Sequence, residues 1–257
     1  MKKISILSLI LILFFFACKK EELPAPLPPE EPEMPEMPVV PEEPDTMEVI
    51  PSTSYDTLRY LALGDSYTIG ESVAFNERFP IQLQDRLAAD TVQIDTTIII
   101  AQTGWRTDNL QNAILNANPT NDFNLVSLLI GVNNQFQGRP VEVYRNELAA
   151  LIDQAVSFAG GRKERVIMVS IPDWSFTPFG QNFGDPAVTT ERVALFNEVK
   201  AQVCDSIGVT LYNITPISQQ GLDMPELVAN DGLHPSGVQY GRWVDAFYED
   251  VLDLLKQ

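Results

Sequence analysis

The chain has 257 residues, of which 45% are hydrophobic and 20% are charged, and its formal net charge is -18. This length supplies enough apolar surface for one sizeable core. A strongly acidic surface repels the phosphate backbone, so we expect no nucleic-acid partner. The two cysteines and the single histidine are too few for a disulfide framework, a cysteine-rich zinc site or a metal site with two imidazole ligands.

The first eighteen residues have the pattern of a bacterial export signal. A short basic start precedes an apolar run over residues 4–17, which is short for a membrane span. Cys18 follows a small residue, as in the lipobox of lipoproteins, although Phe15 stands where leucine is usual. The pattern predicts a signal peptide over residues 1–18 and a lipid anchor at Cys18. Residues 18–22 resemble the lipoprotein export signal of Bacteroidota, so we expect an outer-membrane protein and leave its periplasmic or cell-surface orientation open.

The next segment, residues 19–56, is rich in proline and glutamate. Ten of the nineteen prolines fall within residues 19–52. Proline removes backbone donors and favours extended polyproline II, and like charges stretch such a chain further. A segment of this composition has too little apolar surface to fold by itself. We therefore expect a spacer, followed by a single domain over residues 57–257.

Short apolar runs and helical patterns alternate through this domain. The apolar runs predict β-strands at 58–63, 96–101, 125–130, 166–171 and 209–214. Apolar residues at helical spacing predict α-helices at 79–87, 107–117, 141–159, 188–207 and 238–255. Thr107 or Asp108 suits the N-cap of the second of these helices. Because wholly apolar strands alternate with helices, we expect a three-layer α/β/α sandwich with a five-stranded parallel sheet in flavodoxin-like order.

Four short segments stand where predicted strands end or where the last helix begins. They are residues 64–67, 103–105, 131–134 and 231–235, which read Gly-Asp-Ser-Tyr, Thr-Gly-Trp, Gly-Val-Asn-Asn and Asp-Gly-Leu-His-Pro. Reactive groups of parallel α/β sheets collect at the carboxyl ends of the strands. The segments therefore predict a reactive site at this edge of the sheet.

Ser66, His234 and Asp231 have the chemistry of a nucleophile, its base and the acid that orients the base. A serine hydroxyl is a poor nucleophile until a neighbouring base takes its proton, and imidazole suits that task near neutral pH. His234 is the single histidine, so it must be the base of any histidine-assisted serine. Asp231 stands three residues earlier and can fix the imidazole tautomer. Gly64 permits a tight turn before the serine, and we expect Asp65 to shape that turn through hydrogen bonds.

Together the four segments resemble the SGNH, or GDSL-type, esterase and lipase family, in the family's order and over nearly the whole domain. The family is named for a serine, a glycine, an asparagine and a histidine, which correspond here to Ser66, Gly104, Asn133 and His234. The resemblance implies an oxyanion hole made by the backbone N–H groups of Ser66 and Gly104 and the side-chain amide of Asn133. The family often has an aspartate after the asparagine, where this chain has Asn134.

Residues beside these segments are candidates for substrate contacts. The aromatic loop at residues 174–186 is either a wall of the substrate pocket or a packed cover over the sheet end, and the pattern leaves both open. Asn134 likewise suits a structural role as well as a contact with substrate. The predicted substrate-binding residues are Trp105, Arg106, Asn134, Trp174 and Phe176.

The resemblance implies a serine esterase that hydrolyses carboxylic esters through an acyl-enzyme, without a cofactor or a metal. Two substrate classes stay open: fatty acyl esters for a lipolytic or lysophospholipase-like enzyme, and acetylated polysaccharide for an acetyl esterase. A hypothesis of another class is a non-catalytic carbohydrate-binding lipoprotein that keeps the fold. The presence of Ser66, Asp231 and His234 favours an enzyme. We expect a monomer that meets the membrane through its lipid anchor only.

Overall fold

A computed structural model describes residues 58–256. The predicted signal peptide, the lipidation site at Cys18 and the spacer lie outside these residues. The described residues form a parallel sheet with strand order β2-β1-β3-β4-β5. The strands are β1 (Leu58–Gly64), β2 (Ile94–Ala101), β3 (Leu125–Leu129), β4 (Val166–Val169) and β5 (Thr210–Tyr212). The predicted five-stranded parallel sheet and its flavodoxin-like order are confirmed.

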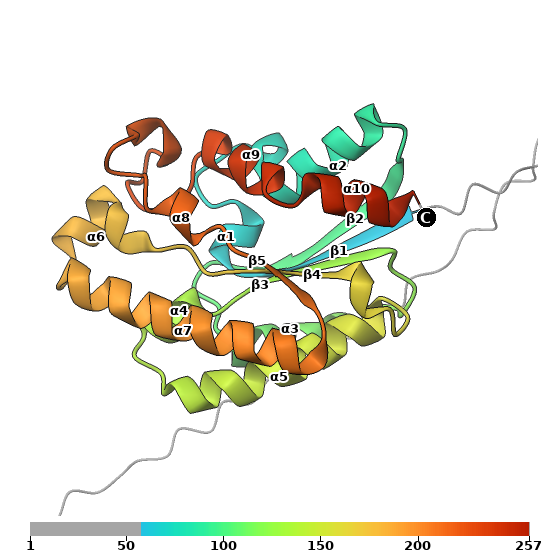
Figure 1. Cartoon of the computed structure of the whole chain (residues 1–257), viewed down its shortest axis with the longest axis horizontal. Coiled ribbons are helices and arrows are strands. Elements are labelled where there is room, and N and C mark those ends of the chain that lie inside the picture. The colour runs from blue at the N-terminus through green and yellow to red at the C-terminus, as the bar shows by residue number, and fades with distance from the viewer. Residues whose placement is uncertain (1–57, 257) are drawn as a thin grey trace, which may run out of the picture. The chain divides into compact units, whose positions relative to one another are not determined.

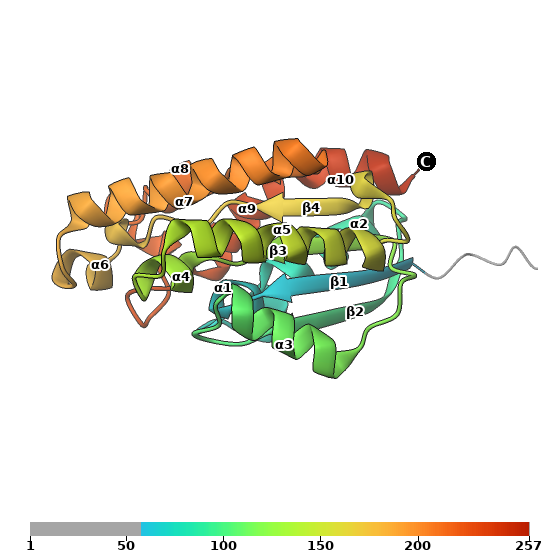
Figure 2. The ribbon, with the colours of Figure 1, turned by 90° about the horizontal axis from the view of Figure 1, so that it is seen from below.

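Helices cover both faces of the sheet because its central strands cannot face water. Every residue of β3 and β4 is buried, as expected for a parallel sheet packed on both sides. One face carries α2 (Phe79–Ala89), α9 (Gly237–Asp245) and α10 (Tyr248–Leu255) (Figure 1). Figure 2 shows the other face, where α3 (Thr107–Ala117), α5 (Val141–Phe158) and α7 (Pro186–Ile207) lie side by side. The three layers confirm the predicted α/β/α sandwich.

Short helices gather at the carboxyl edge of the sheet (Figure 1). They are α1 (Ser66–Ile69), α4 (Val132–Phe136), α6 (Pro178–Asn182) and α8 (Thr215–Ser218). Four 3₁₀ turns complete the described chain, namely η1 (Phe75–Glu77), η2 (Lys163–Arg165), η3 (Trp174–Phe176) and η4 (Pro225–Leu227). The sequence pattern did not predict these elements, because a single turn has too few residues to display a hydrophobic period.

The helix predicted at 238–255 is wrong in one respect, since it is two helices, α9 and α10. Ala246 and Phe247 separate them, and the Phe247 backbone (φ -136, ψ 2) leaves the helical region. The Phe247 ring is buried and packs edge-on against Phe79, with 6.5 Å between the ring centroids. Burying this ring requires the turn, which lets each helix direct its own apolar residues into the core. Neither glycine nor proline marks the break, so the helical pattern continues across it.

The predicted N-cap of α3 is also wrong, because a distant residue completes this helix end. Arg106 is the N-cap, and its backbone N–H donates to Oδ1 of Asn109 at 3.1 Å. The backbone N–H of Thr107 donates to Oδ1 of Asn134 at 3.1 Å, and Nδ2 of Asn134 donates to the Thr107 hydroxyl at 2.6 Å. An asparagine of α4 thus satisfies the backbone donor of the first residue of α3, next to the N-cap at Arg106.

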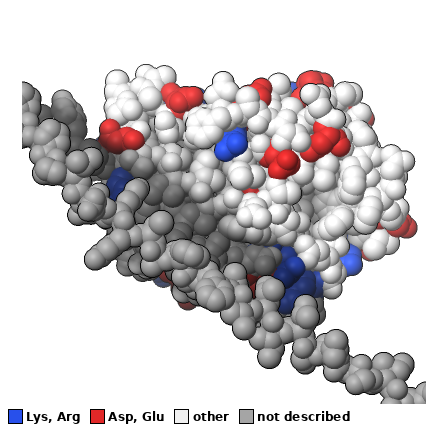
Figure 3. All heavy atoms as spheres, turned by 180° about the vertical axis from the view of Figure 1, so that it is seen from behind, with Lys and Arg blue, Asp and Glu red and all other residues white. Residues whose placement is uncertain are grey.

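Over residues 58–256 there is no helix with both the length and the apolar character needed to cross a bilayer. Figure 3 shows one face on which acidic side chains are scattered over the visible area rather than gathered into one patch. The acidic side chains visible on this face therefore form no single patch.

Gly64, where β1 turns into α1, leaves no room for a side chain. A Cβ at this position would lie 2.1 Å from Oγ1 of Thr68 and 2.4 Å from the carbonyl oxygen of Leu129. That carbonyl belongs to the paired strand β3 and cannot move away. We expect Gly64→Ala to destabilise the fold by about 1–3 kcal/mol, which thermal unfolding followed by circular dichroism would measure as a lower Tm.

Gly241→Ala in α9 is the matched control. Its Cβ would meet the flexible end of Gln82, with Oε1 at 3.1 Å. Alanine is favoured over glycine within a helix by about 0.5–1 kcal/mol, so the Tm should stay the same or rise. A Gly64→Ala protein with the wild-type Tm would contradict the crowded turn.

Candidate active site

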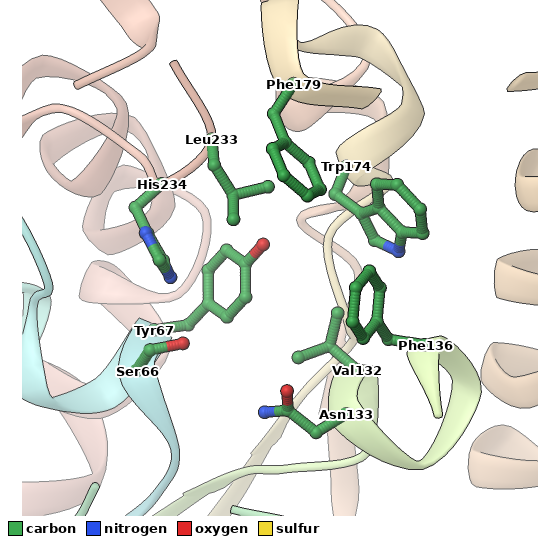
Figure 4. A pocket seen from close by; sticks show the side chains of 9 residues that line it. All are labelled: Ser66, Tyr67, Val132, Asn133, Phe136, Trp174, Phe179, Leu233 and His234. Atoms are coloured by element: carbon green, nitrogen blue, oxygen red, sulfur yellow. The ribbon is translucent and has the colours of Figure 1, made fainter. Parts of the chain in front are cut away.

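Ser66 and His234 come from opposite ends of the domain and line one pocket at the carboxyl edge (Figure 4). Ser66 is the first residue of α1, and His234 lies in the loop before α9. The exposed fractions of the two residues are 3% and 7%. The pocket is small, with a cavity volume of about 80 Å³, which is below the usual range for sites that enclose a drug-sized ligand. The fold therefore brings the predicted nucleophile and the predicted base together.

Asp231 holds the imidazole of His234 within one short loop. Its Oδ2 lies 2.6 Å from Nδ1 of His234, and its Oδ1 accepts the backbone N–H groups of Leu233 and His234, each at 2.9 Å. The Ser72 hydroxyl donates to Oδ2 at 2.7 Å. Burial alone would raise the pKa of Asp231, but these hydrogen bonds outweigh it and hold the pKa at about 2. The carboxylate thus stays ionised at neutral pH and leaves Nε2 free to face the pocket.

The turn before Ser66 is fixed by Asp65, as the sequence led us to expect. Asp65 is the N-cap of α1, and its Oδ1 accepts the backbone N–H of Tyr67 at 3.0 Å. The Tyr67 ring then packs against the imidazole of His234, with 5.1 Å between the ring centroids. One turn of helix therefore positions both the hydroxyl and a ring that supports the base.

Asn133 and Gly104 lie on the two neighbouring loops. Asn133 lines the pocket, and its Nδ2 donates to the carbonyl oxygen of Trp105 at 3.0 Å, which ties α4 to the loop after β2. Gly104 is exposed and has φ +83, but a Cβ there would meet nothing within 4 Å. Glycine is therefore suited to this position by its backbone angle rather than by crowding in the structure.

Of the five predicted substrate-binding residues, Trp174 lines the pocket. Asn134 does not, because it is fully buried and both ends of its amide are bonded to Thr107. Arg106 is held by a two-pronged contact with Asp108, through hydrogen bonds of 3.0 and 2.8 Å. Trp105 and Phe176 are half-buried and are not among the pocket-lining residues. The positions of these four residues therefore do not support the prediction that their side chains contact substrate.

Aliphatic and aromatic side chains form most of the pocket wall, and five of them were not among the residues predicted to contact substrate. They are Tyr67, Val132, Phe136, Phe179 and Leu233. Three of them directly follow or precede a predicted active-site residue, so proximity in sequence to Ser66, Asn133 and His234 was a usable signal. The two phenylalanines required knowledge of how the loops fold.

An aromatic cluster closes one side of the pocket. The ring centroids of Phe136 and Trp174 are 5.4 Å apart, and Phe183 stacks on Phe136 at 5.1 Å and on Phe179 at 5.3 Å. The indole N–H of Trp174 donates to Oε1 of Gln135 at 2.8 Å, so its polar edge is satisfied away from a ligand. The open alternative for the aromatic loop is thereby decided: residues 174 and 179 are walls of the pocket.

The arrangement provides groups for nucleophilic rather than metal chemistry. The hydroxyls of Ser66 and Tyr67, an imidazole and a side-chain amide lie among aliphatic and aromatic side chains (Figure 4). Within the described part of the chain, no three His, Cys, Asp or Glu side chains gather into a group that could hold a metal ion. An imidazole next to a serine hydroxyl, with its second nitrogen bonded to a carboxylate, suits activation of that hydroxyl.

Comparisons with known proteins agree with this geometry. Residues 62–242 match the model of the GDSL-like lipase/acylhydrolase family, whereas no curated protein matches the chain. The esterase EstA from Pseudoalteromonas sp. is 19% identical, with 77% of this chain and 99% of that chain covered and a TM-score of 0.56. A lipase/acylhydrolase from Enterococcus faecalis is 19% identical, with coverages of 77% and 96% and a TM-score of 0.59.

A third solved structure is the acetylxylan esterase Axe2 from Geobacillus stearothermophilus. It is 15% identical, with 78% of this chain and 94% of that chain covered and a TM-score of 0.55. At these identities the solved structures show a common fold and leave the substrate open. The family model covers most of the chain and carries the assignment. This protein belongs to the GDSL-like lipase/acylhydrolase family.

Proposed function

We propose that the protein is a serine esterase that hydrolyses carboxylic esters through an acyl-enzyme, with Ser66 as nucleophile. The observation that carries the proposal is the shared pocket of Ser66 and His234, with Nδ1 of His234 2.6 Å from Oδ2 of Asp231. A carboxylate in that position fixes the imidazole with Nε2 available as the acceptor and stabilises the imidazolium that forms. The family assignment supports the same chemistry.

The proposed reaction has two halves that use the same groups. Nε2 of His234 accepts the Ser66 proton while Oγ attacks the ester carbonyl, and the alcohol then leaves with that proton. In the second half His234 activates a water molecule, which releases the acid and restores the Ser66 hydroxyl. These steps need no cofactor, because the pocket supplies the nucleophile, the base and the carboxylate.

Three donors are proposed for the negative oxygen of the tetrahedral intermediate. They are the backbone N–H groups of Ser66 and Gly104 and the side-chain amide of Asn133, in line with the family resemblance. The Asn133 amide has two N–H bonds, and one of them donates to the Trp105 carbonyl oxygen. A preorganised donor of this kind typically contributes about 3 kcal/mol to transition-state stabilisation.

The lining of the pocket favours an apolar acyl group, and hence a lipolytic or lysophospholipase-like substrate. Apart from Ser66, Asn133 and His234, the pocket is lined by aliphatic and aromatic side chains. Each buried methylene of an acyl chain would contribute about 0.8 kcal/mol. We also propose that Cys18 carries a lipid that anchors the enzyme to the outer membrane, and that the enzyme acts as a monomer.

A second candidate is an acetyl esterase that acts on polysaccharide. The observation that favours it is the stacked pair of Phe136 and Phe183 beside the pocket, which are 41% and 48% exposed. Exposed aromatic faces can pack against the apolar face of a sugar ring, and one structural neighbour is an acetylxylan esterase. The non-catalytic carbohydrate-binding hypothesis would be favoured only if the wild-type protein cleaved no ester.

We expect Ser66→Ala to abolish labelling by a fluorophosphonate probe and to remove hydrolysis of p-nitrophenyl acetate, because both require the serine oxygen. Ser206→Ala is the matched control, since the Ser206 hydroxyl is bonded to the Val203 carbonyl within α7. Gel fluorescence and absorbance at the p-nitrophenolate band measure the two effects. Undiminished labelling of Ser66→Ala would refute Ser66 as the nucleophile.

We expect Asp231→Asn to lower kcat by about 10³–10⁴-fold, because an amide favours the wrong imidazole tautomer and cannot stabilise the imidazolium. Asp108→Asn is the control, since Asp108 is bonded to Arg106 outside the pocket. Steady-state kinetics with p-nitrophenyl acetate gives both values. If Asp231→Asn kept wild-type kcat, the proposed role of the carboxylate would be wrong.

The two substrate classes predict opposite dependence on acyl length. For an apolar acyl pocket, kcat/KM should rise from acetate to hexanoate p-nitrophenyl esters by about tenfold or more, and Phe136→Ala should flatten the rise. Phe75→Ala is the control, because Phe75 is 61% exposed and lies outside the pocket. A wild-type preference for acetate, together with release of acetate from acetylated xylan, would favour the acetyl esterase instead.

A further inference from the structure

Lys200 is a fully buried lysine that the proposed ester chemistry does not use. It lies on the face of α7 that packs on the sheet, beside Val199, Val203 and Cys204. Lysine is almost never fully buried unless its charge is compensated, because removing an ammonium from water is costly. Its Nζ donates a hydrogen bond of 2.7 Å to the carbonyl oxygen of Val169, whereas an ammonium has three donors. A single carbonyl is a weak compensation for a buried cation.

The strand register brings Lys200 and Asp65 to the same edge of the sheet. Gly64 is paired with Leu129 of β3, and β3 is paired in parallel with β4, which ends at Val169. Asp65 follows Gly64, so Asp65 and the Val169 carbonyl both lie at the carboxyl edge, with β3 between them. The Lys200 ammonium, bonded to that carbonyl, therefore lies at the same edge of the sheet as Asp65, two strands away.

Asp65 is the second buried charge, and it contacts the turn of Ser66 directly. It is fully buried, and its Oδ1 accepts the backbone N–H of Tyr67 at 3.0 Å. Its Oδ2 has no hydrogen-bond partner among the described residues. Burial raises the pKa of Asp65 to about 7, although the Tyr67 N–H and the Lys200 ammonium both lower it. A protonated carboxyl would turn one acceptor oxygen into a donor facing these N–H groups.

We infer that Lys200 is a positioning residue whose ammonium favours the ionised form of Asp65, and that the Asp65 carboxylate holds the turn of Ser66 in its reactive position. The inference rests on the proposed ester hydrolysis, since Lys200 touches neither substrate nor a reacting atom. The other titratable groups coupled to these two charges are phenols and a thiol whose pKa values burial raises, so they stay neutral. They are Tyr67 of α1, Tyr144 of α5, Cys204 of α7 and Tyr240 of α9.

Each of the two buried groups shifts the pKa of the other toward its charged form. Burial lowers the pKa of Lys200, and the Asp65 carboxylate opposes that decrease. Without Lys200, Asp65 would be an uncompensated buried carboxylate, and its pKa would rise further. Asp65 would then be protonated at neutral pH and would ionise only as the pH rises. Loss of Lys200 should therefore impair activity at neutral pH and allow recovery in alkali.

The test compares Lys200→Met, Asp65→Asn and the double variant with the wild type. We would measure kcat and KM for p-nitrophenyl acetate from about pH 6 to about pH 10. The acid limb of kcat for Lys200→Met should move to higher pH by about one unit or more, which is about a tenfold loss at neutral pH, with little change in KM. Asp65→Asn should lose activity without recovery in alkali, and the double variant should match it.

Lys163→Met is the matched control, because Lys163 is exposed and donates to the Ile207 carbonyl at 2.6 Å. Its pH profile should equal the wild-type profile. A wild-type profile for Lys200→Met would overturn the inference. So would a double variant more than about tenfold less active than Asp65→Asn, because Lys200 would then act other than through Asp65.

Two further measurements apply if Lys200→Met does not fold or if the wild type cleaves no ester. Should Lys200→Met not fold, the double variant has no unpaired buried charge and must fold, and its failure to fold would overturn the counter-ion role. Should the wild type cleave no ester, the proposed function fails separately. The carboxyl ¹³C shift of Asp65, titrated in wild type and in Lys200→Met, then decides: a raised pKa in the variant supports the pairing, and an unchanged pKa refutes it.

Discussion

The parallel pairing of β1 with β3 is the constraint on which the reactive edge depends. Gly64 and Leu129 are partners in that ladder, so the chain leaves both strands at the same level, about 4.8 Å apart. The turn after β1 carries Ser66, and the turn after β3 carries Asn133. Because both strands are buried on two faces, their register cannot slip without exposing apolar side chains. The hydroxyl and the amide are thereby placed by the core rather than by the loops themselves.

The imidazole reaches the same pocket by a different route. The loop around Asp231 is organised locally, with two backbone N–H groups bonded to one carboxylate oxygen and an isolated bridge between Val228 and Pro235. Its position relative to Ser66 comes from packing, since Tyr67 contacts both the ring of His234 and that of Trp243 in α9. Local hydrogen bonds thus orient the imidazole, and the aromatic contacts of Tyr67 with His234 and with Trp243 of α9 hold it near Ser66.

Two carboxyl groups near Ser66 have different environments within a strongly acidic chain. Asp65 is fully buried, whereas the side chain of Asp231 is 29% exposed. Asp231 accepts several hydrogen bonds, which keep its pKa low. Asp65 has fewer donors and is fully enclosed, so burial dominates and its pKa is raised. Two carboxylates of one site therefore differ because of burial and hydrogen bonding, and a cation nearby matters to the second alone.

The sequence by itself determined the sheet and its covering layers, and it indicated the candidate reactive groups. Short, mostly apolar runs such as 125–130 favour buried strands, and a single histidine can only be the base of a histidine-assisted serine. These features depend on residue type and on spacings of a few positions, and both can be read directly from the sequence. The positions of Ser66 and His234 in one pocket agree with what those patterns indicated.

The tertiary structure alone decided which side chains surround the site and which support it. Asn134 looked like a substrate contact but bonds to Thr107 at the start of α3, a partner 27 positions away in sequence. Phe136 and Phe179 became pocket walls, and Lys200 came to bond to the Val169 carbonyl at the same edge of the sheet, through contacts between separate elements. The break at Phe247 arose in the same way, from a ring that had to be buried. Such roles depend on long-range packing, which no local pattern records.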